Sequence, residues 1–72
     1  MMTDGGEYPP YATVLKDQRG HYYSAVMAWS KAYDTYTVSL THPTGRHTDR
    51  RTAMREAAEL ARIFEMEVRD VN

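Results

Sequence analysis

The feature that most constrains the fold is a run of apolar residues at helical spacing, which spans residues 48–65. At about 100° per residue, one face of this helix collects Ala53, Ala57, Leu60, Ala61 and Phe64. Most of these side chains are small, so the helix can lie close to the surface on which it packs. Leu60 and Phe64 are the only large side chains on that face before Val68, and we expect both to be buried.

Polar residues define the start and the outer face of this helix. Thr48 is the expected N-cap, and Asp49 follows it where the helix dipole favours an acid. Arg51, Arg55 and Arg62 lie together on the face opposite the alanines. Because Glu59 follows Arg55 by four residues, these two side chains are expected to form a surface ion pair.

Two strands joined by a hairpin are predicted near the N-terminus. Residues 11–16 form the first strand, and residues 17–20 form a four-residue turn in which Gly20 adopts a positive φ. Residues 21–29 form the second strand, which has bulky side chains on both faces. A strand with two apolar faces is typically central in a sheet and covered on both sides.

A third strand is predicted over residues 35–41, after a turn at residues 30–34. In it Tyr36, Val38 and Leu40 alternate with threonine and serine. This alternation predicts one face against the core and one face that is a row of hydroxyl groups.

The elements together predict an α+β fold, a three-stranded antiparallel sheet in the order β-β-β-α with one helix packed on one face. Residues 66–71 either prolong the helix or form a short fourth strand, and we favour the strand. Residues 1–10 are expected to be a flexible N-terminal arm, and residues 11–72 a single domain.

Composition narrows the functional classes. The 72-residue chain has no cysteine and a formal net charge of −1, which argues against a DNA mimic and against a strongly basic, non-specific nucleic-acid binder. It has neither the apolar core of a signal peptide nor a run long enough to span a membrane. We therefore expect no membrane association, and the lack of cysteine is compatible with a cytoplasmic location.

No residue pattern predicts catalysis, so the protein is not expected to be an enzyme or to hold a cofactor. The chain has no cysteine nucleophile, no G-x-S-x-G and no H-E-x-x-H sequence. His42, His47 and Asp49 are close in sequence, but their spacing matches no standard zinc site. We therefore predict no metal site.

Two groups of residues are candidates for partner binding. On the second strand, Tyr23, Met27 and Trp29 lie on one face, and Tyr22 and Val26 lie on the other. One helix cannot cover both faces, so part of the strip formed by Tyr22, Tyr23, Val26 and Met27 is expected to be exposed. The second group is the basic start of the helix, which comprises Arg46, Arg50, Arg51 and Arg55.

Exposed apolar sheet surface is commonly buried by self-association. We therefore predict a homodimer with the second strand or a sheet edge at or near the interface.

The β-β-β-α layout with a basic helix start, over residues 11–64, resembles the arm-site DNA-binding domains of phage integrases and, more loosely, double-stranded-RNA-binding folds. The short length, the single α+β layer and the near-neutral charge resemble the small accessory proteins of bacteriophages and mobile elements, among them the anti-CRISPR proteins. The second resemblance implies a non-enzymatic inhibitor that binds a host protein or protein complex in the cytoplasm of a host bacterium. The first implies nucleic-acid binding as the alternative.

Overall fold

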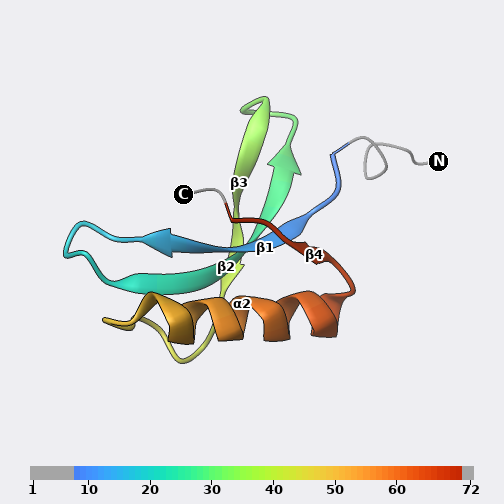
Figure 1. Cartoon of the computed structure of the whole chain (residues 1–72). Coiled ribbons are helices and arrows are strands. Elements are labelled where there is room, and N and C mark those ends of the chain that lie inside the picture. The colour runs from blue at the N-terminus through green and yellow to red at the C-terminus, as the bar shows by residue number, and fades with distance from the viewer. Residues whose placement is uncertain (1–7, 71–72) are drawn as a thin grey trace.

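The computed structural model describes residues 8–70 and contains one helix and one four-stranded sheet (Figure 1). The elements are β1 (Tyr11–Lys16), β2 (Tyr22–Ser30), β3 (Thr35–Thr41), α2 (Arg50–Phe64) and β4 (Glu67–Val68). The predicted α+β class and the β-β-β-α order are confirmed. The residues after the helix form a short strand rather than more helix.

The sheet has the strand order β3-β2-β1-β4. β1 and β3 both pair with β2 in antiparallel fashion, and β4 pairs with β1 in parallel. β2 is therefore central, as its two apolar faces predict. In Figure 1 the helix lies along one side of the sheet, and the far ends of β2 and β3 rise away from it.

The turn between β1 and β2 forms as predicted. Gly20 has a φ of 84°, and the Asp17 carboxylate accepts hydrogen bonds from the backbone N–H groups of His21 and Arg19, both at 2.9 Å. The hydrogen bond from His21 is the main reason that the pKa of Asp17 lies below its ordinary value. This turn fixes the register in which Ala12 lies opposite Val26.

The core lies between α2 and one face of the central strands. Val14 and Ser24 also pair across β1 and β2, on the same face as Ala12 and Val26. The buried apolar cluster consists of Ala12, Val14, Val26, Ala53, Ala57, Leu60 and Ala61. Ala53 and Ala57 are fully buried, so the alanine face lets the helix approach the sheet closely.

Both ends of the helix differ from the prediction. Asp49 rather than Thr48 is the N-cap, because its carboxylate accepts from the backbone N–H of Arg51 at 3.0 Å. Phe64 is not part of the core and is 48% exposed. The reason is Glu65, whose left-handed conformation (φ 56°) ends the helix directly after Phe64. The chain then reverses, and Met66 packs against the core instead.

The two-faced alternation predicted for β3 is wrong. Between Val26 and Met27 the pairing shifts register, so that Leu40 lies opposite Val26 and Val38 lies opposite Met27. A bulge of this kind places Val38 and Leu40 on opposite faces of the sheet. Neither enters the core, because α2 packs on β1, β2 and β4, and within residues 8–70 it has no contact with β3. Val38 is 47% exposed and Leu40 is 36% exposed.

The two predicted ends of the chain are only partly described. Residues 1–7 of the predicted arm and residue 71 of the predicted last strand lie outside the described residues. β4 is short, and the backbone N–H of Arg69 extends its pairing with a 2.9 Å hydrogen bond to the carbonyl of Ala12.

Candidate binding surfaces

The predicted binding strip on β2 is mostly used inside the protein. Val26 is 5% exposed and belongs to the core, so its prediction as a partner-binding residue is wrong. Met27 lies on the other face and is half-buried. Tyr22 packs against the core, and the ring of Tyr23 is covered by the Arg46 guanidinium at 3.7 Å from the ring centroid.

An aromatic cluster covers the far end of the sheet face opposite α2. The ring of Tyr8 stacks on Trp29 with centroids 3.8 Å apart, and Tyr36 meets Trp29 edge-on at 5.3 Å. Tyr11 packs edge-on against Tyr36 at 4.8 Å, and the Tyr36 hydroxyl donates a hydrogen bond to the carbonyl of Pro9. The chain thus supplies its own cover, with residues just before β1, for a face that the helix leaves open.

The four arginines predicted as a basic cluster do not act together. Arg46 forms an ion pair with Asp17 at 3.2 Å, and Arg50 forms one with Asp70 at 2.6 Å. Arg51 and Arg55 are exposed, and within residues 8–70 no carboxylate lies within ion-pair distance of either guanidinium. Among the described residues, the predicted cluster is therefore split into two arginines with a carboxylate partner and two without one.

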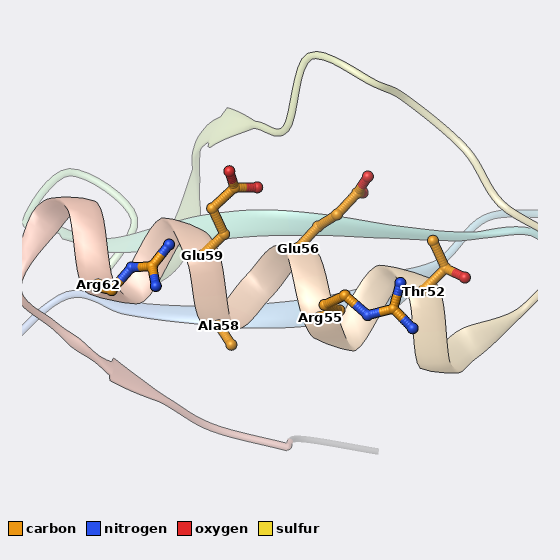
Figure 2. A pocket seen from close by; sticks show the side chains of 6 residues that line it. All are labelled: Thr52, Arg55, Glu56, Ala58, Glu59 and Arg62. Carbon is orange, nitrogen blue, oxygen red and sulfur yellow. The ribbon is translucent and has the colours of Figure 1, made fainter.

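Arg62 also lies on the outer face of α2, and within residues 8–70 it too has no carboxylate at ion-pair distance. The three residues span about 16 Å along the helix at 1.5 Å per residue. A surface hollow of about 520 Å³ on this side is lined by Thr52, Arg55, Glu56, Ala58, Glu59 and Arg62 (Figure 2). In Figure 2 Glu56 and Glu59 point to one side of the helix, while Arg55, Ala58 and Arg62 lie along the other. We call Arg51, Arg55 and Arg62 the arginine row.

A histidine–glutamate cluster fastens the loop after β3 to the helix. His47 Nε2 lies 2.8 Å from one carboxylate oxygen of Glu56, and the Thr44 hydroxyl donates to the other at 2.5 Å. His42 Nε2 lies 2.9 Å from the Glu59 carboxylate. Glu59 therefore pairs with His42 and not, as predicted, with Arg55.

The residues weighed as metal ligands make other contacts in the structure. Of the three residues weighed as ligands, Asp49 caps the helix and the two histidines bond to glutamates. Among the residues that the structure describes, no three His, Asp or Glu side chains are placed to hold a metal ion.

The groups around Glu56 lower the pKa of its carboxyl group in the folded protein. Burial by itself raises the pKa of Glu56, but hydrogen bonds from Thr44 and His47 and the charge of His42 outweigh it. The net result is a pKa below the ordinary value of 4.5. In acid the unfolded chain therefore takes up the proton more readily than the folded protein does.

Stability is consequently expected to fall in acid through Glu56. Its contribution is complete above a pH of about 4.5 and is lost as the pH falls through the lower folded-state pKa. Urea unfolding of the wild type and of Glu56→Gln between neutral pH and pH 3, at about half-unit steps, measures this. The free energy of unfolding should fall more steeply in acid for the wild type, and parallel curves would contradict the assignment.

The outer edge of β3 is a surface that sequence reasoning missed. β3 ends the sheet, and its seven residues, TYTVSLT, include no charge and no proline. Natural proteins usually protect edge strands with such residues, with bulges or with covering elements. In β3 the bulge near Ser39 interrupts the edge. The sequence does show that this strand is long and uncharged. Its position at the edge of the sheet follows only from the strand order.

Comparison with protein-family models, with curated proteins and with solved structures finds no match for this chain. No helix within residues 8–70 is both long enough and apolar enough to cross a membrane.

Proposed function

We propose that the protein is a non-enzymatic protein-binding module whose contact surface is the outer edge of β3. One observation carries this proposal: an uncharged strand at the edge of the sheet exposes Val38 and Leu40, one on each face. Scattered exposed apolar residues are common, but here they lie beside backbone groups that can accept another strand.

Strand addition is the binding mode that this edge supports. An extended partner segment would supply hydrogen bonds to the outward N–H and C=O groups of β3, and its side chains would alternate between the two faces. Val38 on one face and Leu40 on the other would then contact partner side chains on both sides of the sheet. Since α2 leaves β3 uncovered, a partner strand meets no steric obstacle from the helix.

The proposal extends to the biological role. We propose that the partner belongs to a host defence system and that binding blocks one of its surfaces, as in the anti-CRISPR proteins. The support is the resemblance in size and layout, together with a single α+β layer that offers a binding edge. A protein that acts by covering a surface needs no catalytic group of its own.

Nucleic-acid binding is the second candidate, and the arginine row favours it. Arg51, Arg55 and Arg62 have no carboxylate partner within residues 8–70, so their guanidinium groups are available to phosphates. Arg46 and Arg50 are no longer part of this candidate site, because each already forms an ion pair.

Capture experiments with matched variants test the two candidates. The tagged wild type, Val38→Lys and Ile63→Lys are each used to capture proteins from a nuclease-treated bacterial lysate. Lysine blocks strand addition at an edge, whereas Ile63 is 60% exposed on the helix and serves as the control. A protein captured by the wild type and by Ile63→Lys, but not by Val38→Lys, supports the proposal. Equal capture by all three overturns it.

The arginine row is tested in a separate binding assay. If it binds phosphates, the affinity of the wild type for duplex or single-stranded DNA falls steeply with salt. Replacing Arg51, Arg55 and Arg62 by glutamine should then remove most of that affinity. No measurable binding at low salt eliminates the second candidate.

A further inference from the structure

We infer that in the free protein the edge of β3 is occupied by β3 of a second copy, in an antiparallel pair related by a two-fold axis at Thr37. This inference rests on the proposed function, because it names the first partner of the same edge. It replaces the looser prediction of a dimer at β2 or at a sheet edge with one strand and one register.

The composition of β3 makes the edge compatible with itself. Like charges that lie directly opposite each other destabilise a pair of strands, and a charged residue on the two-fold axis would face its own copy. The sequence TYTVSLT has no charged residue, so no register of self-pairing brings like charges together. Four of its seven residues are hydroxyl-bearing threonine or serine, which can form hydrogen bonds across the pair.

The bulge selects the register. Residues that face each other across two strands must lie on the same face of the sheet, and the regular alternation of β3 holds only up to Val38. A pair centred on Val38 would set Tyr36 against Leu40 of the second copy, although these two residues lie on opposite faces of the sheet. A pair centred on Thr37 instead sets Tyr36 against Val38 of the second copy.

The side chains of this register match. Tyr36 and Val38 are paired in β2 with Trp29 and Met27, so both lie on the sheet face opposite the helix. An aromatic ring and a β-branched side chain form a favourable cross-strand pair, and the two-fold axis creates this pair twice. The exposed part of Val38 would be covered by the second copy of Tyr36, next to the aromatic cluster.

The helix leaves room for the second copy beside β3. α2 contacts β1, β2 and β4, and no contact with β3 is present within residues 8–70. The other edge of the sheet is different, because β4 is only two residues long. The β3 edge therefore offers the longer strand to a second chain.

The chain has no cysteine, so single cysteines can report the register. Residues that face each other in an antiparallel pair have Cα atoms about 4.5–5.5 Å apart, within the range of a disulfide. Thr37→Cys should therefore form a covalent dimer under mild oxidation. In the same register the two copies of residue 39 are about four residues out of alignment, roughly 13 Å along the strand. Ser39→Cys is therefore the matched control, and it should stay uncrosslinked.

Light scattering measures the mass of the unmodified protein at micromolar concentration. The expected mass of the wild type is twice the 8.3 kDa of the chain. The Val38→Lys variant should have the monomer mass of 8.3 kDa, and the Ile63→Lys variant should have the dimer mass. Crosslinking of Thr37→Cys but not of Ser39→Cys supports the register. A wild-type mass of 8.3 kDa, or equal crosslinking of both cysteine variants, overturns the inference.

The two proposals fail in different ways. If the wild type is a monomer but Val38→Lys fails to capture the protein that the wild type captures, the inferred dimer is wrong. The proposal that the β3 edge binds a protein partner then stands. If the dimer forms at Thr37 but capture does not depend on Val38, the proposed function is wrong and the dimer stands.

Discussion

Val26→Asp is expected to leave the protein unfolded at room temperature. Val26 lies on the central strand, is 5% exposed and packs in the core under α2. A carboxylate placed there has no partner, and burying an unpaired charge costs several kcal/mol. That loss is comparable with the whole stability of a small domain, about 5–15 kcal/mol. Circular dichroism should show loss of the folded spectrum and no cooperative melting.

Met27→Asp is the matched control for this substitution. Met27 follows Val26 directly, lies on the opposite face and is half-buried, so a carboxylate there keeps access to water. We expect a folded variant with reduced stability. A folded Val26→Asp protein beside an unfolded Met27→Asp protein would mean that the helix packs on the other face of the sheet.

Leu60→Ala is expected to reduce the free energy of unfolding by about 2–5 kcal/mol. Leu60 is 5% exposed, and the other residues that the helix contributes to the buried cluster are all alanines. Truncation removes its apolar contacts and leaves a cavity, which the small neighbours cannot fill. Urea denaturation gives the change directly, from the midpoint and the slope of the transition.

Phe64→Ala provides the comparison, because sequence periodicity places both residues on one face. In the structure Phe64 is 48% exposed, so only part of its apolar surface is buried. Phe64→Ala should therefore reduce the free energy of unfolding by about 1 kcal/mol. Equal losses for the two variants would contradict the observed end of the helix.

The sequence predicted those parts of the fold that depend on local patterns. The boundaries of β3, the Asp17–Gly20 turn and the alanine face of the helix were all correct, because each is encoded by residues close together in the chain. The exposure of Phe64 was not predictable from local patterns. The helix ends because Glu65 adopts the left-handed conformation, and glutamate has no intrinsic preference for that conformation.

The candidate site was less predictable, because it depends on which surfaces remain uncovered. Tyr8 stacks on Trp29 on the face of the sheet that a single helix leaves open, and Arg46 covers Tyr23 from a loop distant in sequence. The apolar side chains of β2 were correctly recognised, but on this face Tyr8 and Arg46 cover them from segments whose sequence has no periodic pattern. The bulge in β3, which exposes Val38 and Leu40 on different faces, likewise has no glycine to mark it.

The two edges of the sheet also differ in when they can form during folding. β3 reaches β2 through a short hairpin, so this edge requires only local chain closure, which is fast. β4 must meet β1 across almost the whole chain: Thr13 and Arg69, which are hydrogen-bonded beside this pairing, are 56 residues apart. Closing so long a loop costs more entropy. We therefore expect the β3 edge to form before β4 pairs with β1, which would let two chains meet at β3 while α2 is still undocked.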